Sequence, residues 1–277
     1  PELRKDSSAL KYCIPPGTAI PTLTMSQATP ILSLFSLTGR VGIVTGANSG
    51  LGLEITRALA EAGASKIYGF DLPKVPGPEF VDVSESFKNK IEYVCGDVTE
   101  QQNMWQKIQE IAEKEGRLDF CVAAAGIALE HSCLECKADD FEKTMNVNCN
   151  GLFYTAQACA RQMVKFGIEG SIVLIASVAG SVALQGMQLV AYQASKGAVL
   201  AIGRTMAAEL GPQKIRVNTL SPAYIPTALT RPLFAPPGVA ESCASQNPLG
   251  RLGKPHEVCG AALWLVSDAS TYCTGSE

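Results

Sequence analysis

A tyrosine and a lysine lie one helical turn apart in residues 191–196, and their side chains could together move a proton. The stretch has no Gly or Pro before Gly197, which predicts a helix, and residues at i and i+4 share one helix face. A free tyrosine has a pKa of about 10, and a nearby cation lowers that pKa because it favours the phenolate. Tyr192 beside Lys196 is therefore a candidate acid/base near neutral pH. Taken alone, the pair also fits a half-buried tyrosine next to a lysine whose stem covers apolar surface.

A glycine-rich turn at residues 46–52 provides a second chemical signal. It follows an apolar run at 40–45 and precedes helical spacing at 53–61, which predicts a strand, a turn and a helix. Glycine permits close approach of the backbone, and the helix N-terminus offers free N–H groups to a pyrophosphate. A glycine-rich loop without a ligand is the alternative. The candidate nucleotide-binding residues of this turn are Gly46, Asn48, Ser49, Gly50, Leu51 and Gly52.

The strand predicted at residues 66–71 ends in Asp71, about 20 residues past the glycines. An acid at this place accepts hydrogen bonds from the ribose hydroxyls of adenosine and repels a 2′-phosphate. The glycine turn and the position directly after Asp71 hold no Arg or Lys that would bind such a phosphate. We therefore expect NAD rather than NADP as the cofactor. An ordinary aspartate at the end of a strand is the alternative.

Alternating strands and helices must position these side chains. Short apolar runs predict strands at residues 40–45, 66–71, 91–95, 118–124, 171–176 and 215–220. Helical spacing predicts helices at 53–61, at 99–115 with Thr99 as N-cap, and at 141–166, 190–210 and 255–266. Nearly continuous apolar strands that alternate with helices indicate the α/β class, here a single Rossmann-type doubly wound parallel sheet with helices on both faces.

Several segments interrupt this regular pattern. Asn and Gly at 146–151 would destabilise the interior of the predicted helix 141–166, so they predict a functional kink. Residues 72–90 are expected to form a long loop with room for a short helix, and residues 228–253 a mobile flap with one short helix. We expect residues 1–37 to be an extended N-terminal arm and residues 38–277 to be the folded domain.

Composition limits the classes of function. The 277 residues are 47% hydrophobic with a net charge of −3, which suits one sizeable domain and argues against a nucleic-acid or anionic-membrane partner. The apolar runs are too short to span a membrane. The 10 Cys are scattered and suggest a reducing compartment, so we expect a cytoplasmic protein. With 2 His in the chain, a zinc site and a Ser-His-Asp hydrolase are both disfavoured.

Together the motifs match one family in order and spacing. They are Thr45, Gly46, Gly50, Gly52, Asp97, Asn148, Ser177, Tyr192, Lys196 and residues 222–227. Over residues 38–275 the chain resembles the short-chain dehydrogenase/reductase family. The resemblance implies a nicotinamide cofactor and an oxidoreductase that interconverts a secondary alcohol and a ketone.

The resemblance also implies roles for individual residues. Tyr192 would be the general acid/base, and Lys196 would lower its pKa and hold the nicotinamide ribose. Ser177 would bond the substrate oxygen, and Asn148 would hold a water in a proton relay through Lys196. Further cofactor-binding residues implied by the resemblance are Asp71, Asp97, Val98, Ala124, Ala125, Gly126, Pro222, Ala223, Ile225 and Thr227.

Three features depart from the family pattern. Residues 123–126 carry Ala where the family usually has Asn, so a side chain that would support the central sheet is missing. Ala223 replaces the usual Gly after Pro222 and adds a methyl group near the expected nicotinamide site. The sequence also stops shortly after Gly275, where the family continues into a last strand.

The substrate class stays open at the level of sequence. The spacing from Ser177 to Tyr192 exceeds the family's commonest spacing, and with Gln185 it is similar to that of fungal polyol dehydrogenases and ketose reductases. Val178 and Met187, together with Tyr224 on the flap side, would instead suit a less polar alcohol or ketone. Alternatives of another class are a non-catalytic nucleotide-binding regulator, or a lyase or epimerase that recycles NAD internally. The resemblance further implies a homotetramer or homodimer joined through residues 141–166 and 192–210.

Overall fold

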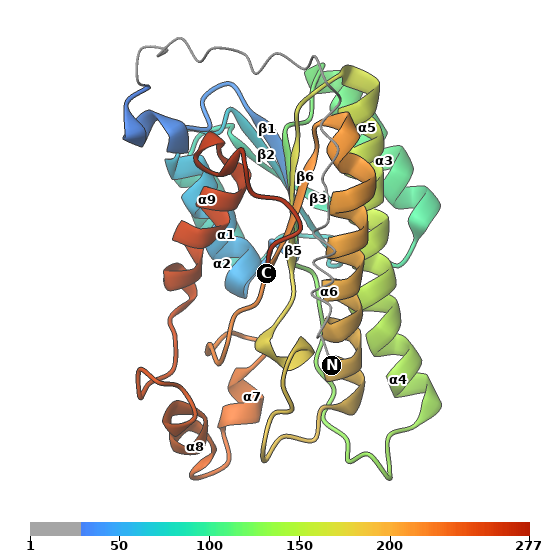
Figure 1. Ribbon diagram of the computed structural model, residues 1–277, viewed down its shortest axis with the longest axis vertical. Coiled ribbons are helices and arrows are strands. Elements are labelled where there is room, and N and C mark those ends of the chain that lie inside the picture. The colour runs from blue at the N-terminus through green and yellow to red at the C-terminus, as the bar shows by residue number, and fades with distance from the viewer. Residues whose placement is uncertain (1–28) are drawn as a thin grey trace, which may run out of the picture. The chain divides into compact units, whose positions relative to one another are not determined.

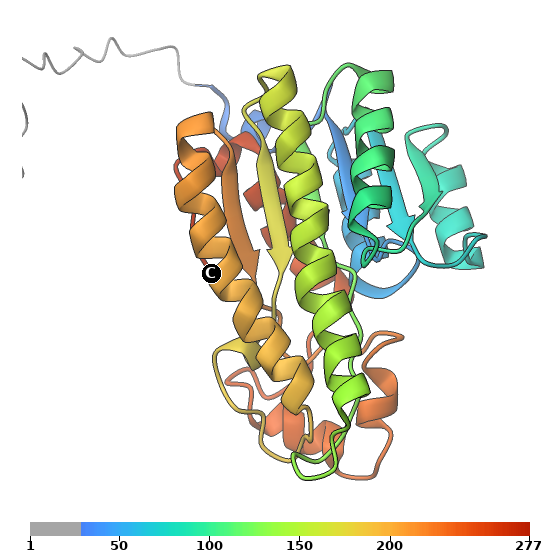
Figure 2. The same cartoon turned by 90° about the vertical axis from the view of Figure 1, so that its right-hand side faces the viewer.

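Six parallel strands form the centre of the structure, a computed structural model that describes residues 29–277 (Figures 1 and 2). Their order in the sheet is β3-β2-β1-β4-β5-β6, and every neighbouring pair is parallel. The strands are β1 (Val41–Thr45), β2 (Lys66–Asp71), β3 (Ile91–Cys95), β4 (Phe120–Ala123), β5 (Ser171–Ile175) and β6 (Arg216–Leu220). The predicted strands and the predicted doubly wound sheet are confirmed.

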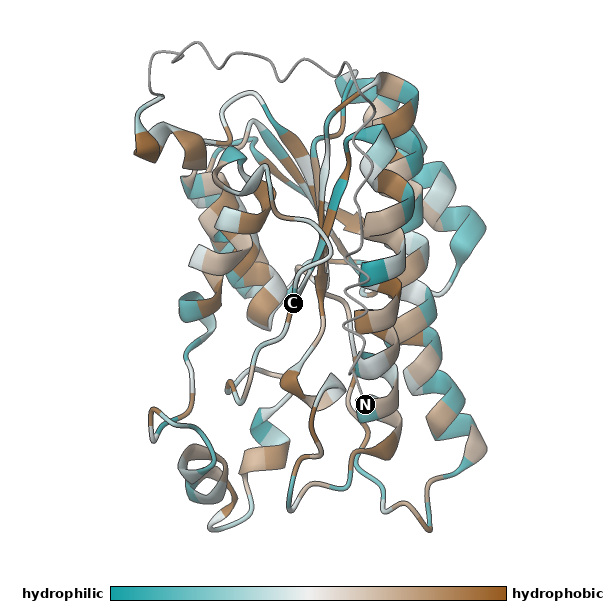
Figure 3. Ribbon diagram, in the orientation of Figure 1, coloured by the Kyte–Doolittle hydropathy of each residue, from teal (hydrophilic) through white to brown (hydrophobic). Residues whose placement is uncertain are grey.

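Helices cover both faces of the sheet (Figure 1). One face carries α1 (Gly50–Glu61), α2 (Pro78–Ser86) and α9 (Cys259–Val266), and the other carries α3 (Gln101–Glu115), α5 (Leu152–Phe166) and α6 (Val190–Leu210). Successive strand residues point to opposite faces, so Ile43 packs in the core beside α3 and α5 while Val44 packs in the core beside α1 and α9. Figure 3 shows hydrophobic residues in the central strands and in the helices on both sides of them.

The strand order reverses between β1 and β4. From β1 the chain winds outward to β2 and β3 on one side, and from β4 it winds outward to β5 and β6 on the other. In a sheet of this kind a crevice opens beyond the carboxyl ends of the strands at the reversal, and ligands bind there. The glycine turn after β1 and the residues after β4 and β5 therefore meet at one edge of the sheet.

The predicted helix at 141–166 is divided by a π-helix. It begins as α4 (Ala138–Met145), passes through the π-helix Asn146–Gly151, and continues as α5. One extra residue per turn displaces the chain, and such bulges occur often at functional sites. A Cβ on Gly151 would lie 2.6 Å from a methyl of Val98, so this glycine permits the displaced backbone to approach the cavity wall. The expected interruption of the helix is confirmed.

Three local predictions need correction. Glu100, not Thr99, precedes the first helical residue of α3, because Thr99 instead donates through its backbone N–H and its hydroxyl to Asp97 Oδ1. The helix predicted from residue 255 begins as the 3-10 turn Pro255–Val258, and α9 starts only at Cys259. The flap holds two short helices, α7 (Arg231–Phe234) and α8 (Val239–Ser245), where one was expected.

The two ends of the described chain both contact the domain. The compact unit spans Ile31–Glu277, and Leu37 is fully buried, so residues 31–37 of the expected arm belong to the domain; the rest of that arm lies almost wholly outside the described residues. At the other end Gly275 N–H donates to Val217 O at 2.7 Å, and Thr219 N–H donates to Ser276 O at 2.9 Å. The last residues therefore lie along the edge of β6.

Among the described residues, no helix has the length and apolar character that crossing a membrane would require.

Candidate active site

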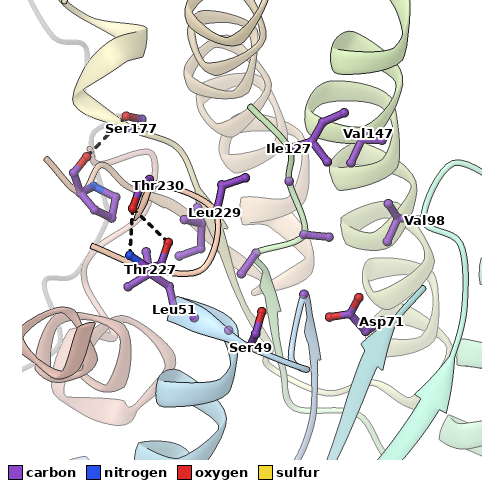
Figure 4. Close-up of a pocket in the computed structure, with 18 of the residues that line it drawn as sticks. Ser49, Leu51, Asp71, Val98, Ile127, Val147, Ser177, Thr227, Leu229 and Thr230 are labelled. Atoms are coloured by element: carbon purple, nitrogen blue, oxygen red, sulfur yellow. Dashed lines mark hydrogen bonds between the residues drawn. The ribbon is translucent and has the colours of Figure 1, made fainter. Parts of the chain in front are cut away.

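A cavity of about 550 Å³ lies at the carboxyl edge of the sheet (Figure 4). Its walls come from the turns that follow β1 to β5, from the start of α6 and from the segment after β6. The predicted site residues that line it are Gly46, Ser49, Gly50, Leu51, Gly52, Asp71, Asp97, Val98, Ala124, Ala125, Gly126, Ser177, Tyr192, Lys196, Pro222, Ala223, Ile225 and Thr227. All the predicted cofactor residues but Asn48, and all the predicted catalytic residues but Asn148, thus share one cavity.

The remaining predicted residues are not among those lining this cavity. They are Asn48, Asn148, Val178, Gln185, Met187 and Tyr224. The Tyr224 hydroxyl donates to Gln246 in the flap, and its ring meets Phe234 edge-on. Four of the six expected substrate residues therefore belong to surrounding loops rather than to the cavity wall.

The cavity also has walls that the sequence did not reveal. These are Phe70, Leu72, Gly96, Ile127, Lys143, Val147, Ile175, Ala176, Leu229 and Thr230. Phe70, Leu72, Gly96, Ile175 and Ala176 end or directly follow predicted strands, so the rule that ligands bind at strand ends could have found them. Lys143 and Val147 come from α4 and the π-helix, and no motif marks them.

The glycine turn leaves the N-terminus of α1 open toward the cavity. Gly46 and Gly50 have φ of 68° and 58°, and a Cβ on Gly52 would lie 2.1 Å from Gly46 O, so larger residues would not fit. Ser49 makes no side-chain cap bond, and the first turn of α1 carries no acid. The first N–H groups of a helix lack partners within the helix. The turn therefore suits an anion such as a pyrophosphate.

Asp71 is held in place at the end of β2. Its Oδ2 accepts from Asn48 N–H at 3.0 Å, and its Oδ1 accepts from Leu72 N–H at 2.8 Å. Asn48 Oδ1 accepts in turn from Gly77 N–H at 2.7 Å. Asn48 thus contributes by fixing the loop around Asp71, and the carboxylate borders the cavity with a set orientation.

Thr45 supports the turn after β4, where the family's asparagine is missing. Its Oγ1 accepts from the N–H groups of Ala124 and Ala125, at 3.1 and 3.2 Å. A Cβ on Gly46 would lie 2.9 Å from Ala124 O. The two turns are therefore packed directly on each other, and one hydroxyl holds the second turn.

Ser177, Tyr192 and Lys196 line the same cavity. Ser177 begins the 3-10 turn Val178–Gly180, where its Oγ accepts from Ala179 N–H at 3.2 Å. Its hydroxyl donates to Pro222 O at 3.5 Å, and it also lowers the pKa of the phenol of Tyr192, which lies in the first turn of α6. Lys196, one turn later, donates from Nζ to Ile175 O at 2.7 Å, and Nζ lies 5.6 Å from the centroid of the Tyr192 ring.

The expectation that Lys196 lowers the pKa of Tyr192 needs correction for the protein alone. Burial raises the pKa of the Tyr192 phenol, and the Ser177 hydroxyl acts in the opposite direction. Burial also lowers the pKa of Lys196 from 10.5 to about 8. The ammonium is itself desolvated and bonded to Ile175 O, so its influence on the phenol does not overcome burial.

Asn148 lies fully buried in the π-helix. Its side chain exchanges two hydrogen bonds with the backbone of Ile127, at 2.8 and 2.9 Å, and donates to Ser195 Oγ at 3.0 Å. The residue fixes the loop after β4 behind the cavity. Within residues 29–277, no group of three or more His, Cys, Asp or Glu side chains could hold a metal ion.

Known proteins resemble this chain in fold and in sequence. Residues 46–277 match the family model described as Enoyl-(Acyl carrier protein) reductase. A sorbose reductase of Schizosaccharomyces pombe is 37% identical over 248 residues, which covers 88% of this chain and 95% of that protein. The crystal structure of a short-chain type dehydrogenase/reductase from Mycobacterium marinum has a TM-score of 0.84 at 35% identity and covers 89% of this chain and 96% of its own. The crystal structure of a gluconate 5-dehydrogenase from Burkholderia cenocepacia, in complex with NADP and tartrate, has a TM-score of 0.82 at 33% identity, with 89% and 95% covered.

The chain therefore belongs to the short-chain dehydrogenase/reductase family. These relatives are named as reductases and dehydrogenases, so the chain belongs to a family of oxidoreductases.

Proposed function

We propose that the protein interconverts a secondary alcohol and a ketone with NAD as cofactor and Tyr192 as general acid/base. The observation that carries the proposal is that Ser177, Tyr192 and Lys196 line the same cavity as the open N-terminus of α1. The first group suits proton transfer, and the second suits a pyrophosphate. One cavity thus offers a place for the pyrophosphate in the middle of a dinucleotide and a place for the reaction at its nicotinamide end.

The residues present fit a nicotinamide dinucleotide. Gly46, Gly50 and Gly52 leave room for the pyrophosphate, and Asp71 presents a fixed acceptor to the adenosine ribose. Ile225 and Thr227 border the same cavity as Ser177 and would hold the nicotinamide carboxamide. When bound, the nicotinamide supplies a hydride acceptor or donor at the carbon that reacts.

The protein's own groups handle the proton. In oxidation, the alcohol hydroxyl would give its proton to the Tyr192 oxygen while the C–H bond breaks and the carbonyl forms. Ser177 would donate to the same substrate oxygen and keep it within reach of the phenol. The Lys196 ammonium is held by Ile175 O close to Tyr192, where it would hold the nicotinamide ribose. Reduction runs through the same positions in reverse.

Turnover tests this mechanism against a non-catalytic nucleotide-binding role. We expect the purified protein to reduce NAD with at least one member of a panel of polyols and secondary alcohols. The absorbance of the NADH formed measures the rate. Tyr192→Phe removes the proton acceptor and should lower kcat by about 10²-fold or more. Equal turnover by Tyr192→Phe would refute the acid/base role. Loss of substrate without net NADH formation would instead favour a lyase or epimerase.

The preference for NAD is argued from charge. A 2′-phosphate at the adenosine ribose would meet the Asp71 carboxylate, and the side chain that follows is Leu72. The Burkholderia relative is described with NADP, so the neighbours do not decide the matter for this chain. We expect kcat/KM for NAD to exceed that for NADP, and Asp71→Ser to narrow the ratio by about tenfold or more, because a like charge is removed. A wild-type preference for NADP would refute this use of Asp71.

Sugar alcohols and the corresponding ketoses are the proposed substrates. One support is the sequence identity with a sorbose reductase and with a gluconate 5-dehydrogenase. The other is the pair of hydroxyl groups, of Ser177 and Thr230, on the cavity wall. Ile127, Val147 and Leu229 make part of the same wall apolar, which supports a small apolar alcohol instead. Comparing kcat/KM for polyols with that for cycloalkanols of similar size distinguishes the two substrate classes.

We propose that copies of the chain associate through the exposed faces of α5 and α6. The scattered thiols support a cytoplasmic location as a further proposal.

A further inference from the structure

The Asn148 side chain has no free hydrogen to offer a substrate or a water. A side-chain amide has two N–H donors and one oxygen acceptor. Both donors of Asn148 are used, one on Ile127 O at 2.9 Å and one on Ser195 Oγ at 3.0 Å, and its oxygen accepts from Ile127 N–H at 2.8 Å. Asn148 is fully buried, so these hydrogen bonds fix the orientation of its side chain.

Ser195 is the partner that joins Asn148 to the catalytic helix. Its side chain is fully buried, accepts from Asn148 Nδ2, and donates to Tyr192 O at 2.7 Å. One hydroxyl therefore uses its donor on the backbone of the catalytic tyrosine and an acceptor site on the asparagine of the π-helix. Ser195 also directly precedes Lys196 in α6.

We propose that Ser195 is a positioning residue for the catalytic step. It holds the first turn of α6 and the π-helix Asn146–Gly151 in one register, so that the Tyr192 phenol meets the Ser177 hydroxyl and the Lys196 ammonium meets Ile175 O. The idea rests on the proposed function and extends it, because Ser195 reaches the reaction only through Asn148 and Tyr192. A buried hydroxyl with both roles filled is well suited to this task, since neither partner can shift without leaving a polar group unpaired.

The first test is Ser195→Ala. It leaves one Asn148 N–H without a partner and frees the carbonyl of Tyr192 from its lateral bond. We expect kcat to fall by about 10- to 100-fold, because small misplacements of reacting groups have effects of this size. KM for NAD should change little, because the glycine turn and Asp71 are untouched. The pH at which kcat is half-maximal should also move, because the contact between Tyr192 and Ser177 is altered.

A double-mutant cycle separates positioning from general stability. Ser195→Ala and Asn148→Ala act on one bond, so the double variant should be no slower than the slower single variant. Ser195→Thr keeps the hydroxyl and should recover kcat to within about threefold of wild type, since a helical threonine also bonds a preceding carbonyl. Full additivity of the two alanine variants, or a Thr variant as slow as the Ala variant, would overturn the proposal.

The matched control is Ser171→Ala. Ser171 in β5 is also buried and donates to Leu265 O at 2.7 Å, but it lies away from the cavity. Its loss should lower the melting temperature and leave kcat and the pH profile unchanged. If Ser195→Ala does not fold, Ser195→Cys weakens both hydrogen bonds at nearly constant volume and carries the same expectation.

The outcomes keep this proposal distinct from the proposed function. Wild-type turnover, an inactive Tyr192→Phe and a Ser195→Ala variant with wild-type kcat and pH profile would overturn the role of Ser195 alone. Absence of turnover by the wild type would overturn the proposed function and this role with it.

Discussion

Lys196 lies almost fully buried beside Tyr192, with its ammonium bonded to Ile175 O. Burial lowers its pKa from 10.5 to about 8, which corresponds to about 3 kcal/mol of unfavourable folding free energy while the lysine is charged. Between about pH 8 and 10.5 the unfolded chain holds a proton that the folded chain has released. The free energy of unfolding therefore rises with pH in this window, and the catalytic site weakens the fold at neutral pH.

Lys196→Met removes the buried charge and keeps a side chain of similar length. We expect the variant to lose turnover and yet to be more stable than wild type at pH 7, by about 1 to 3 kcal/mol. The difference should shrink toward pH 10, because wild-type Lys196 is then neutral in the folded state. Urea unfolding of both proteins at the two pH values measures it. A difference that does not depend on pH would contradict the assignment to the ammonium.

Ser177 opposes the effect of burial on Tyr192. Because its hydroxyl lowers the pKa of the phenol, Ser177→Ala should raise that pKa further. Oxidation needs the phenolate, so the rising limb of kcat/KM should move to higher pH, and reduction should lose rate from the missing bond to the substrate oxygen. A pH series in both directions checks this. An unshifted limb would show that Ser177 acts on the substrate only.

Residue types predicted which side chains share the cavity better than they predicted the pKa values of those side chains. The one-turn spacing of Tyr192 and Lys196 placed both on the cavity wall, as expected. The sign of the Tyr192 shift was missed, because it depends on how much protein surrounds the phenol and a motif carries no information on burial. The bonds of Asn148 to Ile127 and Ser195 were equally hidden, since they join residues far apart in the sequence.

At the scale of elements, the 3-10 turn Val178–Gly180 packs tightly on α6. A Cβ on Gly180 would lie 2.7 Å from the backbone C and O of Lys196. This turn starts at Ser177, so the close approach brings the Ser177 hydroxyl to Tyr192. Gly180 in this turn faces Gly197 in α6, and an added Cβ would be crowded at Gly180 but not at Gly197.

Gly180→Ala should push the turn away from α6. We expect a loss of about 1 to 3 kcal/mol of stability from overpacking and a fall in kcat of about tenfold or more as Ser177 and Tyr192 separate. Gly197→Ala is the matched control, because its Cβ would meet Gly180 O at an ordinary 3.5 Å. Because Gly197 lies in the interior of α6, this substitution should raise the free energy of unfolding by about 0.5 to 1 kcal/mol and leave kcat unchanged. Equal kcat for the two variants would argue against this positioning of Ser177.

Elements with strong periodicity were predicted well. The central strands are buried apolar runs between turn residues, while β3 at the sheet edge is only partly buried. The helix α6 is long and is stopped by Gly211 and Pro212, as its local pattern predicts. The flap helices α7 and α8 are four and seven residues long, respectively, too short for a period to show. The capping of α3 was missed because Thr99 bonds Asp97 instead.

For the whole molecule, the association of copies is open to a direct test. Val164 in α5 is 46% exposed, and a charge there would be buried in the proposed interface. Val164→Glu should therefore lower the mass in light scattering to that of a smaller assembly while the circular dichroism spectrum stays unchanged. Leu134→Glu, at a position 97% exposed in a loop, should keep the wild-type mass. Unchanged mass for Val164→Glu would place the interface elsewhere.

The fixed carboxylate at the end of β2 has a consequence for how a nucleotide arrives. Asp71 is oriented by two backbone N–H groups, and its loop is tied to Asn48 through Gly77, all within the protein itself. Little ordering entropy then remains to be lost when adenosine docks. AMP and ADP-ribose should consequently behave as competent fragments, competing with the full dinucleotide and giving measurable heats in calorimetry. The adenosine side of the cavity would in this way supply binding energy that brings the nicotinamide to the catalytic side chains.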